Sequence, residues 1–89
     1  MAHIDYATIP QAVREALDRH AEEHAPTGDF TTAVLRNDLM QAISRADADS
    51  LRALPSICAY VMIYLPGGCH GSREKVAAWR AAATVWSAT

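Results

Sequence analysis

The chain has 89 residues, 51% of them hydrophobic and 20% charged, with a formal net charge of −2 at pH 7. This composition is too apolar for a disordered chain and is typical of one globular domain, here residues 1–89. A weakly acidic protein gains little by meeting a polyanion, which excludes broad direct binding to nucleic acid or to an anionic membrane surface. So short a chain uses most of its apolar residues on one core, and we expect its function to lie on its surface.

No segment has the properties of a membrane anchor or a secretory signal. The longest apolar run, from Ile57 to Leu65, has nine residues, whereas roughly 20 are needed to span a bilayer. The N-terminal residues lack a basic segment ahead of an apolar one. We therefore expect a cytoplasmic protein that contacts no membrane, with Cys58 and Cys69 present as thiols.

The first predicted helix begins near Thr8, a suitable N-cap, holds Pro10 in its first turn and ends near Glu23. One side of this helix is apolar at helical spacing: Ile9, Val13, Ala16, Leu17 and His20. The other side carries four carboxylates, here called the acidic face: Glu15, Asp18, Glu22 and Glu23. Residues 1–29 have a local net charge of −4 and residues 71–89 one of +2, so the chain is electrically polar from end to end.

A turn at residues 25–28, with Pro26 and Gly28, separates the first helix from the second. The second helix carries an apolar set too wide for one stripe: Phe30, Val34, Leu35, Leu39, Met40 and Ile43. This width predicts burial on more than one side and places the helix at the centre of the core. A bend is expected at Asn37 or Asp38, and Leu39→Ala should destabilise the protein by about 2 to 5 kcal/mol.

A third helix follows the cap-forming residues 46–50, with apolar side chains at alternating spacings of three and four: Leu51, Leu54, Cys58, Val61 and Leu65. Pro55 cannot donate to the carbonyl of Leu51, so either this helix starts near Leu54 or its first turns are irregular, and we expect a kink there. Residues 66–71 form a loop, and Ser72 caps a fourth helix. The inner side of that helix is Val76, Trp79, Ala83 and Trp86. The expected fold is a small all-α bundle of about four helices.

The segment from His20 to His24 matches H-x-x-E-H, in which two histidines one turn apart hold zinc. A catalytic zinc needs a third protein ligand and a cleft, so the favoured alternative is a solvated helix terminus. Cys58 and Cys69 also lack zinc-like spacing; Cys58 is interpreted as a core residue and Cys69 as a loop thiol. We therefore predict no catalytic residue, no metal and no cofactor.

The loop from Gly67 to Ser72 leads into Arg73 and Lys75, where unpaired amides and two cations could hold an anion. An ordinary glycine loop closed by a serine cap is the favoured alternative. Trp79 and Trp86 are interpreted mainly as core residues, with Trp86 the better interface candidate of the two.

The stretches PTGDFTTAVLRNDLMQAISRADAD and GCHGSREKVAAWR resemble small phage and prophage proteins, most of them without an assigned function. The resemblance covers residues 26–80, with two departures: His70 replaces a usual tryptophan, and Pro55 interrupts the third helix. Small acidic proteins of this kind are similar to the class from which anti-CRISPR inhibitors are drawn.

The resemblance implies a non-enzymatic inhibitor, a monomer or homodimer, that binds a bacterial host protein complex. The acidic face would dock on the basic nucleic-acid channel of a type I surveillance complex (Cascade) and block target DNA. The expected partner-binding residues are Glu15, Asp18, Glu22, Glu23, Arg73, Lys75 and Trp86. The alternative is a small helical DNA-binding regulator or another phage accessory protein, although the most basic helix offers only Arg73, Lys75 and Arg80. A metal-dependent hydrolase built on His20 and His24 is a third reading.

Overall fold

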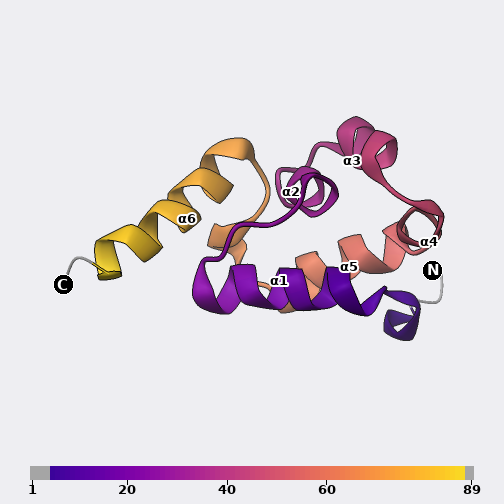
Figure 1. The fold of residues 1–89 in the computed structure, drawn as a ribbon, viewed down its shortest axis with the longest axis horizontal. Coiled ribbons are helices and arrows are strands. Elements are labelled where there is room, and N and C mark those ends of the chain that lie inside the picture. Colours follow the sequence, from indigo (N-terminus) through magenta and orange to yellow (C-terminus); the bar gives the residue numbers. More distant parts are fainter. Residues whose placement is uncertain (1–4, 88–89) are drawn as a thin grey trace.

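The computed structural model describes the backbone of residues 5–87 and the side chains of residues 5–82. All regular secondary structure in this part of the chain is helical, with no strand, which confirms the all-α prediction (Figure 1). It contains six α-helices and two short 3-10 helices rather than about four helices, because two predicted helices are each divided in two. The elements are η1 (Tyr6–Thr8), α1 (Gln11–Glu23), α2 (Asp29–Leu35), α3 (Leu39–Arg45), α4 (Ala48–Arg52), α5 (Leu54–Tyr64), η2 (Gly67–Cys69) and α6 (Arg73–Ser87).

Helix α1 begins three residues later than its predicted cap. Thr8 belongs to η1, where its hydroxyl donates to the carbonyl of Asp5, and Pro10 occupies the N-cap position of α1. The predicted end is confirmed, since α1 stops at Glu23. His24 then adopts a left-handed conformation, with φ of 57°, and its amide donates to the carbonyls of Arg19 and His20. This reversal turns the chain back toward α2.

The second predicted helix is broken at the expected place but packs differently from the prediction. Asn37 has a left-handed φ of 62°, and the Asp38 side chain accepts from the amide of Gln41 as the N-cap of α3. The break shifts the helical phase, so the apolar stripe of α2 does not continue into α3. Leu39, Met40 and Ile43 are 57%, 77% and 43% exposed. Their predicted place at the centre of the core is therefore wrong, and Ala42 is the buried residue of α3 instead.

Pro55 lies in the first turn of α5, where its missing N–H leaves no helical hydrogen bond unmade. Of the two alternatives, the structure shows a helix that starts at Leu54, and a break between two helices takes the place of the expected kink. The preceding residues form the separate short helix α4, whose N-cap is Asp47: its side chain accepts from the amide of Ser50 at 2.8 Å. Ala53 joins the two helices, and Leu51, expected on the inner side, is 47% exposed.

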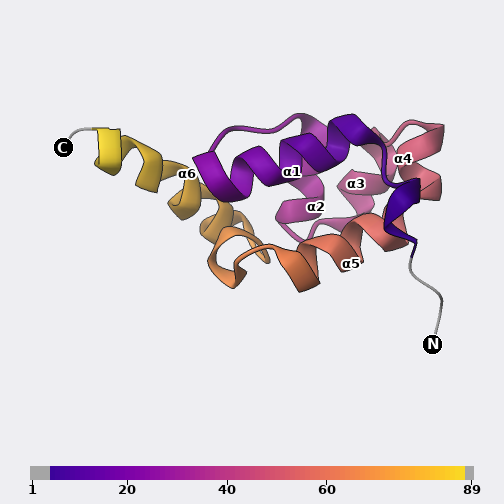
Figure 2. The same cartoon turned by 90° about the horizontal axis from the view of Figure 1, so that it is seen from below.

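The core lies between α1, α2, α5 and the start of α6. Its fully buried side chains are Leu17, Leu35, Ile57, His20, Val76 and Cys69. Helices α1 and α5 both run along the long axis of the molecule, which measures 43 × 22 × 22 Å (Figure 2). Helix α6 extends outward from one end of this body (Figure 1).

The predicted cap of the last helix is confirmed, because Ser72 Oγ accepts from the amide of Lys75 at 3.1 Å. Val76 is fully buried, and half-buried Trp79 donates its ring N–H to the carbonyl of His20 at 2.6 Å. The first half of the predicted inner side is therefore correct. The side chains of Ala83 and Trp86 lie outside the described part, so the interface prediction for Trp86 is not tested.

Candidate functional site

The two histidines of the H-x-x-E-H segment are bound to the backbone of other segments. His20 is fully buried, with Nε2 2.9 Å from the carbonyl oxygen of Cys69 and Nδ1 3.3 Å from that of Ala25. His24 places Nδ1 2.8 Å from the carbonyl oxygen of Trp79, and its ring packs on that indole with centroids 4.5 Å apart. The predicted solvated terminus is thus wrong for His20, because the loop carrying Cys69 folds over its ring.

The burial of the two cysteines is the reverse of the prediction. Cys69 is fully buried because η2 turns it inward, whereas Cys58 is half-buried and lines a shallow hollow with His70. Burial raises the pKa of both thiols, which keeps them protonated near neutral pH. Among the described residues, no three side chains of the His, Cys, Asp and Glu types gather in a way that could hold a metal ion.

The acidic face of α1 keeps three of its four carboxylates at the surface. Glu15, Glu22 and Glu23 are exposed, whereas Asp18 is half-buried and accepts a hydrogen bond from the Tyr60 hydroxyl at 2.5 Å. This bond raises the pKa of Tyr60. Arg14 lies over the same ring, 5.4 Å from its centroid. Asp18 therefore connects α1 to α5 in addition to contributing to the charge of the face.

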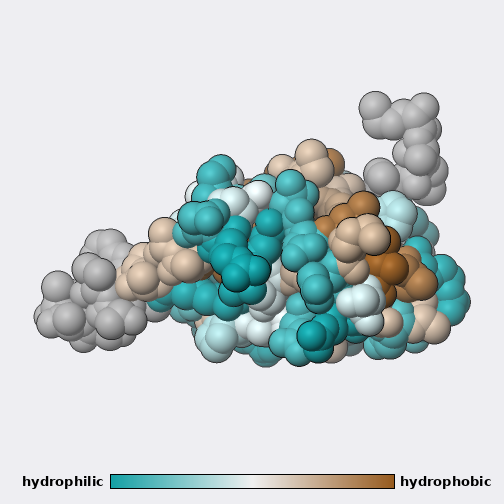
Figure 3. Space-filling view, turned by 90° about the horizontal axis from the view of Figure 1, so that it is seen from above, coloured by the Kyte–Doolittle hydropathy of each residue, from teal (hydrophilic) through white to brown (hydrophobic). Residues whose placement is uncertain are grey.

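Four large apolar side chains gather on the outside of α3 and α4, and we call this surface the apolar face. Its members are Leu39, Met40, Ile43 and Leu51. Figure 3 shows hydrophobic surface concentrated over these two helices, beside a hydrophilic band over α2 and the start of α6. A second exposed apolar group, Met62, Ile63 and Tyr64, lies at the end of α5. The sequence interpretation missed the apolar face because it treated residues 30–43 as one buried helix.

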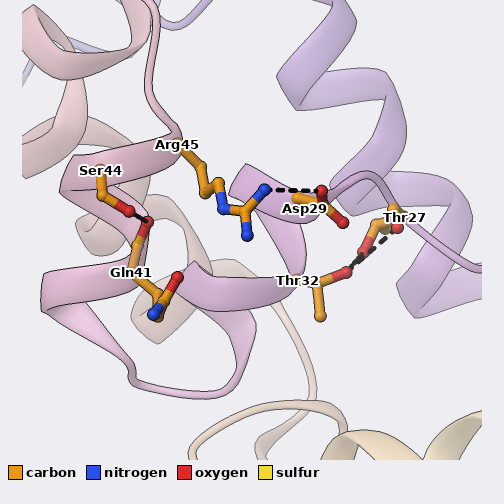
Figure 4. Close-up of polar contacts among 6 residues, drawn as sticks. All are labelled: Thr27, Asp29, Thr32, Gln41, Ser44 and Arg45. Atoms are coloured by element: carbon orange, nitrogen blue, oxygen red, sulfur yellow. Dashed lines mark hydrogen bonds and ion pairs between the residues drawn. The ribbon is translucent and has the colours of Figure 1, made fainter.

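A polar pocket of about 260 Å³ opens between α2, α3 and the start of α6, and we call it the arginine pocket. Figure 4 shows part of its wall, where Arg45 reaches from α3 to Asp29 on α2 and Thr32 contacts Thr27. The Arg45 Nη1 to Asp29 Oδ2 distance is 3.3 Å. The side chains around the pocket are Arg36, Arg45, Arg73, Thr32, Gln41, Asp29, Asp38 and Ala33.

Two backbone amides of the predicted anion-binding loop, expected to be unpaired, are hydrogen-bonded to backbone carbonyls. Gly71, with φ of 115°, donates its N–H to the carbonyl of Leu35 at 2.7 Å, and the Cys69 amide donates to Pro66. Arg73 lines the arginine pocket beside Arg36, whereas Lys75 is exposed and is not among the lining residues. The two predicted cations are thus not brought together at the loop. No local pattern in the sequence indicates that Arg73 would join arginines more than 25 positions away.

Comparison of the chain with family models, with curated proteins and with solved structures found no match in any of the three. Within the described residues, every helix is too short or too polar to cross a bilayer.

Proposed function

We propose that this protein is a non-enzymatic binding protein of phage type that inhibits a host protein complex in the bacterial cytoplasm. The observation that carries the proposal is the apolar face, where Leu39, Met40, Ile43 and Leu51 are each more than two-fifths exposed. A domain that excludes large apolar side chains from its core and groups them on one surface has a candidate protein interface.

The state of the chemically reactive side chains supports a binding role. Both ring nitrogens of His20 face backbone carbonyls, and Nδ1 of His24 does the same. The two thiols have raised pKa values and are therefore poor nucleophiles near neutral pH. These groups hold the fold together, which leaves the exposed surfaces as the candidates for function.

The charge of α1 favours a basic partner. Glu15, Glu22 and Glu23 are exposed on a helix within a segment of net charge −4. Carboxylates on an open surface accelerate association with a positively charged partner, whereas burial of an apolar surface slows dissociation. The nucleic-acid channel of a type I surveillance complex has the required positive charge, so we propose that complex as the partner.

The test is binding to purified type I surveillance complexes, together with phage plating on hosts whose type I immunity is active. Met40→Ser with Ile43→Ser alters the apolar face, and Met62→Ser with Ile63→Ser makes the same changes on α5 as a matched control. We expect the first pair to weaken binding by about tenfold or more, as loss of central apolar contacts does, and the control pair to bind like the wild type.

A charge-reversal variant tests the acidic face separately. Glu15→Lys, Glu22→Lys and Glu23→Lys together should slow association and remove much of its salt dependence. Asp18 is left unchanged because its bond to Tyr60 stabilises the contact between α1 and α5. A wild-type protein that binds no type I complex would overturn the proposal, and binding to bare duplex DNA instead would favour the helical regulator.

A further inference from the structure

Four arginines from three parts of the chain, the end of α2, α3 and α6, surround one side of α2. Arg36, Arg45 and Arg73 line the arginine pocket, and Arg80 reaches the same helix by donating to Thr32 Oγ1 at 3.2 Å. The lining contains two carboxylates, those of Asp29 and Asp38. The group therefore carries a formal charge of about +2 within a protein whose total is −2. Such a concentration of one sign attracts an anion.

Both carboxylates already have a partner within the protein. Asp29 contacts Arg45, but their side chains are 81% and 55% exposed, so this pair is weak. Asp38 accepts from the amide of Gln41 at 3.3 Å as the N-cap of α3. Among the described residues, no carboxylate lies within ion-pair distance of Arg36, Arg73 or Arg80.

Two guanidinium groups of this cluster have donors without an acceptor. The Nε atoms of Arg36 and Arg80 are enclosed by protein and have no hydrogen-bond partner among the described residues. Enclosed donors are almost always paired in proteins, so two of them beside one pocket indicate an acceptor supplied from outside. Burial first, and then the positive charge of Arg36, lowers the pKa of Arg80. An anion between the two side chains would offset this repulsion.

One member of the cluster is held in position in advance. The Arg80 Nη2 atom donates to Thr27 Oγ1 at 2.8 Å as well as to Thr32, and these two hydroxyls are 2.7 Å apart. A guanidinium tied to two side chains of the scaffold loses less entropy when a ligand binds. The remaining donors of its fork stay available for a planar or tetrahedral oxyanion.

From this geometry we infer that the arginine pocket binds a phosphoryl group. Several guanidinium forks match the three oxygens and double charge of phosphate better than the two oxygens and single charge of a carboxylate. The pocket volume of about 260 Å³ lies below the range of sites for drug-sized ligands. It therefore suits inorganic phosphate or the phosphoryl end of a small phosphomonoester. Of the residues expected to bind the partner, this inference uses only Arg73, which neither test of the proposed function changes.

The experiment is a titration of the isotope-labelled protein with inorganic phosphate, followed by amide chemical shifts at constant ionic strength maintained with chloride. A parallel titration with O-phosphoserine distinguishes a monoester from free phosphate by which of the two binds more tightly. The pocket variant carries Arg36→Gln and Arg73→Gln. The control variant, Arg19→Gln with Arg52→Gln, removes the same charge from exposed arginines on α1 and α4.

We expect saturable shifts in residues 32–45 and 71–76 of the wild type. The pocket variant should bind about tenfold more weakly or worse, since each lost charge-assisted pair is a strong contact, and the control variant should stay within about twofold. Non-saturable shifts in the wild type, or equal affinity in a pocket variant that keeps a dispersed spectrum, would overturn the inference. If the double variant unfolds, Arg73→Gln alone, at an exposed side chain, carries the same comparison.

Discussion

Large apolar residues are buried in α1, α5 and the start of α6 but exposed on α3 and α4. In the first of these regions, Leu17, Ile57 and Val76 are fully buried. In the second, Leu39 and Met40 are more than half exposed, although they are as apolar as the core residues. Hydrophobic character alone therefore does not decide burial, because a side chain is buried only if another element covers it.

The difference follows from what each helix presents to its neighbours. Helices α3 and α4 have seven and five residues and contribute only small side chains to the interior, Ala42 and Ser50. Because the buried residue of α3, Ala42, is small, α3 can lie close to α2. The large apolar residues of α3 lie on its other sides and are exposed. Helices α1 and α5, with 13 and 11 residues, are long enough for two or more turns of each to contribute side chains to the shared core. The helices that supply the large core residues are thus different from the helices that carry the exposed apolar residues, within a chain of 89 residues.

The largest expected contrast between the two regions is in unfolding free energy. Ile57→Ala should destabilise the protein by about 2 to 5 kcal/mol, since it leaves a cavity in the core. Leu39→Ala, first expected to have the same effect, should now change stability by no more than about 0.5 kcal/mol, the usual limit for surface sites. Urea denaturation of both variants measures the difference, and equal losses would show that α3 belongs to the core.

His20 is the polar member of the core, and its replacement gives the next largest effect. His20→Leu removes the donor to the Cys69 carbonyl, and an unpaired buried group of this kind costs about 1 to 3 kcal/mol. Thermal unfolding compares this variant with Arg19→Leu, its exposed neighbour, which should remain close to the wild type. A stable His20→Leu variant would mean that the loop carrying Cys69 does not depend on the imidazole.

The hydrogen bond between Asp18 and Tyr60 joins α1 to α5, and the ionisation of Tyr60 reports on it. This hydrogen bond raises the pKa of Tyr60, so the stabilisation is complete below the unfolded tyrosine pKa and is lost as pH rises through the folded value. Asp18→Asn should move the Tyr60 pKa back down, as measured by tyrosinate absorbance. Glu15→Gln is the control from the same helix, and an equal shift there would deny a specific bond.

The smallest predicted effect concerns His70, which lines a shallow hollow with residues of α2 and α5. Burial first, and then the positive charge of Lys75, lowers its pKa. The folded state therefore prefers neutral His70: the contribution is present above the unfolded pKa of about 6.5 and is lost as pH falls through the folded value. His70→Gln should reduce the slope of stability against pH below neutrality. If the slope of stability against pH is unchanged in this variant, groups other than His70 cause the loss of stability in acid.

Sequence patterns gave helix boundaries best where the signal is local. Ser72 was expected to cap a helix and does so, Asp47 from the cap-forming residues 46–50 caps α4, and Pro55 lies at the start of α5. The bend expected at Asn37 or Asp38 is present. It rotates α3 relative to the apolar stripe of α2, so Leu39 and Ile43 are exposed, contrary to the prediction. Caps, prolines and left-handed turns act within about one helical turn, so their consequences for the backbone are readable from neighbouring residues.

Only the tertiary structure decided which surfaces remain open and which polar groups meet. The bond between Asp18 and Tyr60 joins residues 42 positions apart, and the contact of His20 with Cys69 spans 49. The arginine pocket likewise combines side chains of α2, α3 and α6 that share no sequence spacing. The sequence by itself determined an all-helical chain and most of the places where its helices begin and end. Burial, pairing and pocket formation depend on how those helices cover one another, which is a property of the packed chain as a whole.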